Sequence, residues 1–94
     1  MRPLNSAVPG AIAALLHKAP LSAGKVTFAW RTAVGAAMDR VTSVRLDDHT
    51  LVVEAADTHW AREVSRSSAI VLARLQHLLG RETVTGLTVR VKPS

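Results

Sequence analysis

The strongest constraint on the fold is a change in the spacing of apolar residues between positions 41 and 55. Two segments, VTSVRL and TLVVEA, alternate apolar and polar residues on either side of the turn-forming cluster DDH. A period of two is typical of strands that bury one face. The sequence therefore predicts a β-hairpin. One face carries Val44, Leu46, Leu51, Val53 and Ala55, and the other carries Arg45, Val52 and Glu54.

A third strand is predicted near the end of the chain, in the segment VTGLTVRV. Its apolar residues are Leu87, Val89 and Val91, and they alternate with Thr88, Arg90 and Lys92. This strand therefore has one apolar face and one basic face. A three-stranded sheet with one apolar face needs helices to cover that face.

The first two helices are predicted from apolar stripes with helical spacing. The first helix covers about residues 8–18 and ends before Pro20. Its stripe consists of Val8, Ile12, Leu15 and Leu16. The second helix begins after Ser22, whose side chain can cap it. Its buried face consists of Val26, Trp30, Ala33, Val34 and Ala37, and Gly35 either ends this helix or lets it bend.

The third and longest helix is predicted to run from a cap at Asp57 or Thr58 to Gly80. On a helical wheel, the buried arc consists of Trp60, Ala61, Val64, Ser68, Val71, Leu75, Leu78 and Leu79. The opposite arc consists of Arg62, Arg66, Ala73 and His77. Trp60 is therefore expected to face the core.

Together these elements predict one α+β domain over residues 1–94. The order is helix, helix, strand, strand, helix, strand, with a three-stranded sheet covered by helices on one face. A chain of 94 residues is long enough to bury a core without disulfides, and it has no cysteine. Its apolar runs are far shorter than the ~20 residues that span a bilayer, and no signal peptide is recognised. We expect a cytoplasmic protein without membrane contact.

Positive charge is concentrated in the first half of the chain. Residues 1–46 contain six basic side chains and one acidic one, whereas residues 47–94 contain six of each. This asymmetry favours a polyanion or an acidic protein surface as a partner. Scattered charges that only keep the protein soluble are an equally supported alternative.

Three basic surfaces are candidate binding sites for phosphates or a partner protein. The first is Arg62 with Arg66, and the second is Arg45 with Arg90 and Lys92. The third is Lys25 with Arg31, around Phe28. Packing of Phe28 under the first helix is favoured, and stacking of its ring on a base is the alternative.

No arrangement of residues typical of catalysis is found. The four histidines are spread over the first helix, the hairpin turn and the third helix, and none has another histidine or a carboxylate at a helical spacing that makes a convincing metal site. The aspartates are explained by turn and cap positions, and the glycines form no phosphate-binding loop. We expect a protein that is not an enzyme and needs no cofactor or metal ion.

The chain resembles the DciA-like family of bacterial replicative-helicase loaders. The resemblance rests on Trp30 with Val34 and Gly35, then VRLDDHTLVVEA, then HWAREV, then IVLARLQHLLG and a final strand. It covers about residues 10–91. Trp30, Gly35 and Trp60 occupy motif positions of the family. The chain departs from the family pattern at Ser43 and His49, where members have a proline and a hairpin glycine.

The resemblance implies a KH-like fold and a role in bringing the replicative helicase onto single-stranded DNA, with contacts to both. The chain lacks the G-x-x-G loop with which KH domains clamp a nucleic-acid backbone. We therefore expect a non-enzymatic replication adaptor that binds the helicase and, weakly, nucleic acid. One alternative is an RNA- or DNA-binding module unrelated to the helicase. Another is a domain that dimerises through a sheet edge.

Overall fold

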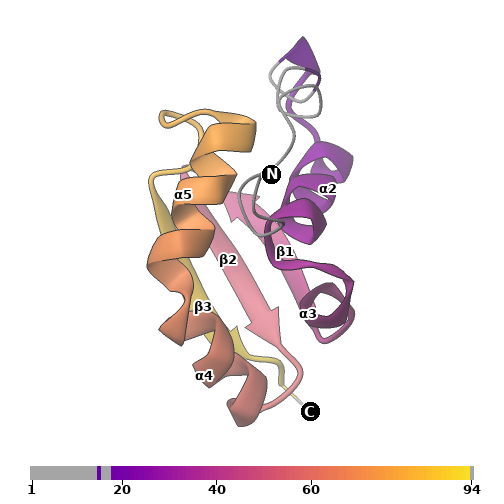
Figure 1. The fold of residues 1–94 in the computed structure, drawn as a ribbon, viewed down its shortest axis with the longest axis vertical. Helices are drawn as coiled ribbons and strands as arrows, with labels where there is room; N and C mark the ends of the chain where they lie inside the picture. Colours follow the sequence, from indigo (N-terminus) through magenta and orange to yellow (C-terminus); the bar gives the residue numbers. More distant parts are fainter. Residues whose placement is uncertain (1–14, 16–17, 94) are drawn as a thin grey trace, which may run out of the picture.

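The structure is a computed structural model that describes residue 15 and residues 18–93 (Figure 1). Nearly all of the predicted first helix, residues 8–18, therefore lies outside the described residues. The described elements are α2 to α5 and β1 to β3, in the order ααββααβ. The predicted α+β class is confirmed, and so is the order of the elements that fall within the described residues, except that two of the predicted helices are each divided in two.

The sheet contains β1 (Thr42–Asp47), β2 (Thr50–Ala55) and β3 (Gly86–Val91), in the order β1-β2-β3. The first pair is antiparallel and the second is parallel. The predicted hairpin is confirmed, because Val44 lies opposite Val53 and Leu46 opposite Leu51. Its turn needs a positive φ, and Asp48 adopts this conformation with φ 58°. Asp tolerates the left-handed region better than most residues do.

The second predicted helix ends at Gly35 and a short helix follows. Ser22 caps α2 (Ala23–Val34) by accepting a hydrogen bond from the backbone N–H of Lys25. At Gly35 the backbone has φ 91° and ψ 164°, a conformation that is essentially restricted to glycine, and α3 (Ala36–Arg40) begins directly after it. Ala37 belongs to α3 and is exposed, so the buried face predicted for this helix ends before it.

Replacing Gly35 with alanine is expected to lower the free energy of unfolding by about 1–3 kcal/mol. No atom lies within 4 Å of the position that the added methyl group would occupy, so the cost comes from the backbone conformation alone. Urea unfolding followed by circular dichroism measures it. Gly24→Ala is the control, since Gly24 is helical and has room for a methyl group. Equal stability of Gly35→Ala and the wild type would contradict this explanation.

The third predicted helix is not continuous, and on this point the prediction was wrong. It consists of α4 (Thr58–Arg66), capped by Asp57, and α5 (Ser68–Leu79), which ends at Gly80. At Ser67 the backbone leaves helical geometry, with φ −102° and ψ 10°. The Ser67 hydroxyl donates to the carbonyls of Glu63 and Val64, at 3.1 and 3.4 Å. Such bonds from a serine side chain compete with the regular helix.

The helices lie on one face of the sheet, with α2 and α3 on one side and α4 and α5 on the other (Figure 1). One cluster of buried side chains joins both helix pairs to the sheet. Its largest fully buried members are Trp30, Leu51, Leu75, Leu78, Val53, Val64 and Val84. The apolar face of β3 reaches the core through Leu87 and Val89, whereas Val91 is exposed.

The fully buried tryptophan is Trp30, whereas Trp60, which was predicted to face the core, lies at its margin, on the same face of α4 as the buried Val64. Trp30 is 0% exposed, and its Nε1 donates to the Thr42 hydroxyl at 2.8 Å. Trp60 is partly exposed and lies outside the core cluster. Val64 is the buried residue of α4. Along this helix the core therefore ends at Val64, one turn after Trp60.

Candidate protein-binding and nucleic-acid-binding surfaces

The first turn of α4 carries two aromatic side chains, the exposed His59 and the partly exposed Trp60. Asp57 fixes this turn by accepting a hydrogen bond from the Trp60 backbone N–H at 3.0 Å. The exposed ring of His59 packs edge-on against the Trp60 ring, with 4.9 Å between centroids and 72° between planes. The two rings form an amphipathic patch on a rigid, capped helix. Tryptophan at such a position combines a large apolar surface with one hydrogen-bond donor.

The two predicted arginines of α4 differ in their surroundings. Arg62 is exposed, and its side chain makes no hydrogen bond or ion pair within the described residues. Arg66 is also exposed, but its Nη1 lies 3.2 Å from Oε2 of Glu63. An exposed pair of this kind contributes little stability, yet it lowers the positive charge that Arg66 presents. Arg62 is therefore the cation of α4 that is free of an ion pair, and it lies one turn after His59, about 160° around the helix from Trp60. We call Trp60, His59 and Arg62 the α4 patch, in which His59 lies between the other two.

The open face of the sheet carries the second predicted group. Arg45 lies opposite Val52, and Arg90 lies opposite Glu54, so both arginines project from the face without helices. Lys92 follows β3 on the same face and is exposed. None of the three cationic groups makes an ion pair within residues 18–93. The carboxylate of Glu54 stands in their midst and reduces the positive charge of this surface.

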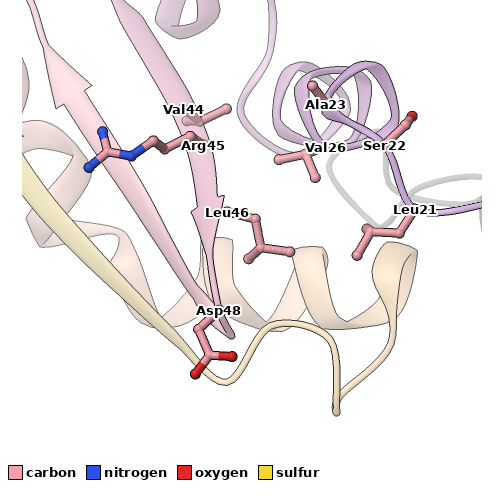
Figure 2. Close-up of a pocket in the computed structure, with 8 residues that line it drawn as sticks. All are labelled: Leu21, Ser22, Ala23, Val26, Val44, Arg45, Leu46 and Asp48. Atoms are coloured by element: carbon pink, nitrogen blue, oxygen red, sulfur yellow. The ribbon is translucent and has the colours of Figure 1, made fainter.

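Val52 also lies on the open face, yet only 6% of it is exposed. Its neighbours across the sheet are Arg45 and Thr88. The Arg45 side chain extends from β1 toward β2 (Figure 2). The methylene groups of arginine commonly cover apolar neighbours while the charged end stays in water. On the open face, the nearly buried Val52 therefore lies between Arg45 and Thr88.

The third predicted group, on α2, is only partly available. The Nζ of Lys25 donates to the backbone carbonyl of Ala19 at 2.7 Å, so this cation supports the chain that leads into the helix. Arg31 is exposed, and Phe28 is 50% exposed. The predicted packing of Phe28 under the first helix involves residues outside the described part of the chain.

The predicted surfaces do not merge into one site. Arg62 is two positions from the buried Val64, which places it about 200° around α4 and directs it away from the sheet. Arg45, Arg90 and Lys92 lie on the opposite face of the molecule. The two surfaces can therefore be occupied at the same time by different partners.

Comparison with protein-family models gives a match over residues 3–89 to the family described as Dna[CI] antecedent, DciA. The chain belongs to the DciA family. Comparison with the curated proteins gives no match. Membership of the DciA family points to a helicase-loading role in DNA replication and implies association with the replicative helicase.

The motif positions of this DciA-family chain have different physical roles. Trp30 fills the core, and Gly35 adopts a backbone conformation that other residues avoid. Trp60 is the motif residue that remains partly exposed. The fold explains why a tryptophan stands at position 30 and a glycine at position 35. Packing in the core does not explain the tryptophan at position 60.

Two apolar grooves lie between elements that are distant in sequence, and the sequence did not predict them. One, of about 360 Å³, separates β1 from the start of α2. The other, of about 230 Å³, lies between α2 and α3 on one side and α4 and α5 on the other. Each groove has one large exposed apolar residue among its lining residues, Leu21 in the first and Ile70 in the second. The sequence contains these two residues, but it does not show which other element lies across the groove from them.

Within the described residues no group of His, Asp and Glu side chains is arranged to hold a metal ion. In the same part of the chain, no helix has the length and apolar character needed to cross a membrane.

Proposed function

We propose that this DciA-family protein is a non-enzymatic adaptor that binds the replicative helicase through the α4 patch. The observation that carries the proposal is the partly exposed Trp60 ring packed against the exposed His59, with Arg62 one turn after His59 and without an ion pair within the described residues. Tryptophan and arginine are the residues most enriched among those that dominate binding energy at protein interfaces. Both project from one capped helix, so little conformational freedom is lost when a partner binds.

The open face of the sheet is the proposed contact for single-stranded DNA. It offers Arg45, Arg90 and Lys92 to phosphates, on the side of the molecule away from the α4 patch. Binding there is expected to be weak, because Glu54 opposes the cations and the chain has no G-x-x-G loop. A KH-like domain in this arrangement holds the strand by charge and shape rather than by a backbone clamp.

Retention of the cognate helicase on immobilised full-length protein tests the adaptor function. Retention is expected at low ionic strength, and the complex is expected to raise the amount of helicase assembled on single-stranded DNA. Absence of a complex at low salt, where electrostatic attraction is strongest, would exclude the proposal. Oligonucleotide binding without any helicase retention would favour the stand-alone nucleic-acid-binding module instead.

Reversing Arg90 and Lys92 to glutamate is expected to weaken binding of a single-stranded oligonucleotide by about tenfold at low salt. Each lost phosphate contact removes about 0.7 from the slope of log affinity against log salt concentration. Fluorescence anisotropy over a salt series measures both quantities. Lys18→Glu with Arg81→Glu is the matched control, since both residues are exposed and the change in net charge is the same. An equal effect of the control would show that only net charge matters.

A further inference from the structure

Glu54 places a carboxylate on the open face of the sheet, among the cations. It lies on the middle strand, β2, opposite Ser43 of β1 and Arg90 of β3. The residue is only partly exposed, yet its side chain makes no hydrogen bond or ion pair within the described residues. A carboxylate that is withdrawn from water normally has such a partner. The oxygens of Glu54 are therefore available to hydrogen-bond donors from a ligand.

A pocket of about 120 Å³ opens beside Glu54, at the end of the sheet where β1 begins. Ser43 of β1 lines it, and so does Lys92, which directly follows β3. Arg40, the last residue of α3, lines it next to the start of β1. Arg40 and Lys92 are exposed, and neither makes an ion pair within the described residues. The pocket therefore brings together one carboxylate, one hydroxyl and two free cations.

These groups fit a nucleotide better than a free phosphate. Glu54 repels an isolated anion, but the Watson–Crick edge of a base can offer it N–H donors. Cytosine carries an amino group from which a carboxylate accepts a hydrogen bond. The hydroxyl of Ser43 can donate to the acceptor that neighbours this amino group on the ring. Side chains directly opposite each other on two strands have Cβ atoms about 5 Å apart, so both can reach one base.

Thymine does not fit the same position. It has a carbonyl oxygen where cytosine has its amino group. Its single Watson–Crick N–H lies between two carbonyl oxygens, so a carboxylate that approaches this edge meets an acceptor on either side. Adenine has an amino group beside an acceptor, as cytosine does, and guanine has two neighbouring N–H donors. The pocket therefore favours bases that carry an amino group.

We propose that Glu54, with Ser43, makes the open face prefer single-stranded DNA in which the base at this pocket is cytosine, adenine or guanine rather than thymine. Arg40 and Lys92 hold the phosphates on either side of that base. This inference rests on the proposed DNA contact and gives Glu54 a role beyond weakening it. It also adds Arg40, which the sequence did not single out, to the cations of this surface.

The ratio of two affinities tests the preference. A cytosine-only and a thymine-only oligonucleotide of equal length differ in the base edge but not in backbone charge. Fluorescence anisotropy at low salt and neutral pH gives the affinity of the full-length protein for each. In Glu54→Gln the ratio of cytosine to thymine affinity is expected to fall about fivefold or more. The amide of glutamine can donate to thymine as well as accept from cytosine, so it discriminates little between them.

Asp47→Asn is the matched control. Asp47 lies on the same face of the sheet, about 13 Å from Ser43 along β1, and its replacement changes the net charge by the same amount. Both oligonucleotides are expected to bind this variant more tightly by the same factor, so the ratio stays that of the wild type. A fall in the ratio as large as that of Glu54→Gln would show that net charge alone acts, and would overturn the preference.

The base preference and the DNA contact can fail separately. An unchanged ratio in Glu54→Gln, with circular dichroism showing a folded protein, overturns the preference. If both oligonucleotides then still lose affinity when Arg90 and Lys92 are reversed, the DNA contact itself stands. If neither oligonucleotide binds the wild type at low salt, both proposals are excluded.

Arg40→Gln tests the phosphate contact next to the start of β1. It is expected to weaken binding of both oligonucleotides about threefold, and to lower the slope of log affinity against log salt concentration by about 0.7, with the ratio unchanged. Arg81→Gln is the control, since Arg81 is exposed and does not line the pocket. An effect of Arg40→Gln no larger than that of Arg81→Gln removes Arg40 from the site.

Discussion

Replacing Trp30 with alanine is expected to lower the free energy of unfolding by about 3–5 kcal/mol. The ring is fully buried between α2 and the sheet, and it is the largest side chain in the core. Its Nε1 donates to the Thr42 hydroxyl, which in turn donates to the Met38 carbonyl at 2.8 Å. Loss of the ring leaves a cavity and breaks the link between α2, α3 and β1. Domains of this size have a stability of about 5–15 kcal/mol, so most of it would be lost.

Urea unfolding monitored by circular dichroism measures the effect, and two variants separate its parts. Trp30→Phe keeps most of the ring volume and leaves Thr42 without its donor, so about 1–2 kcal/mol is expected from it. Thr42→Val removes the acceptor and leaves the buried indole N–H unpaired, with a similar cost. A loss of less than about 1.5 kcal/mol in Trp30→Ala would show that the core collapses around the missing ring.

The features of the fold that are set by residues close together in the sequence could be predicted. The hairpin follows from the period of two in residues 41–55 and from a turn cluster that includes an aspartate able to adopt a positive φ. The caps at Ser22 and Asp57 follow from side chains that accept backbone N–H groups three residues later. Gly35 and Gly80 end their helices with positive φ angles.

The two errors have a common physical origin. A helical wheel treats residues 58–79 as one straight helix, whereas the Ser67 hydroxyl bonds to the carbonyls one turn earlier and divides it. The wheel also assumes that the core extends along the whole helix. The position at which the core ends depends on where the sheet lies under α4. The spacing of apolar residues shows which face of the helix is buried, but not how far along the helix the core extends. Trp60 was therefore assigned to the core, although it lies at its margin.

The candidate sites could also be predicted only in part. The spacing of apolar residues in each helix and strand predicts that Arg62, Arg66, Arg45 and Arg90 are exposed, and the structure agrees. Which of the two helical arginines is paired also follows from the sequence. Glu63 is adjacent to Arg62 but lies one turn before Arg66, and side chains three residues apart face each other on a helix, so Glu63 pairs with Arg66 and leaves Arg62 free. Whether the charged groups share one face is a property of the packed domain, and here they lie on two.

Trp60→Ala is expected to weaken helicase binding by about 2 kcal/mol or more, roughly a thirtyfold rise in the dissociation constant. The partly exposed ring lies outside the core, so the same change is expected to cost only about 1–2 kcal/mol of stability. Large loss of binding with small loss of stability separates Trp60 from Trp30, whose replacement affects both through unfolding. Isothermal titration of helicase into each variant, at a temperature where both remain folded, measures the difference.

Arg62→Glu and Arg66→Glu form a matched pair that tests the charge in the same patch. Both residues are exposed on α4 and the change in charge is identical, but Arg66 is paired with Glu63 and Arg62 is free. If Trp60 and Arg62 form one contact, Arg62→Glu weakens binding about tenfold or more, and Arg66→Glu has a distinctly smaller effect. Equal effects would indicate long-range attraction by net charge, which high salt would abolish in both. Unchanged affinity in Trp60→Ala and Arg62→Glu alike would place the helicase contact elsewhere on the molecule.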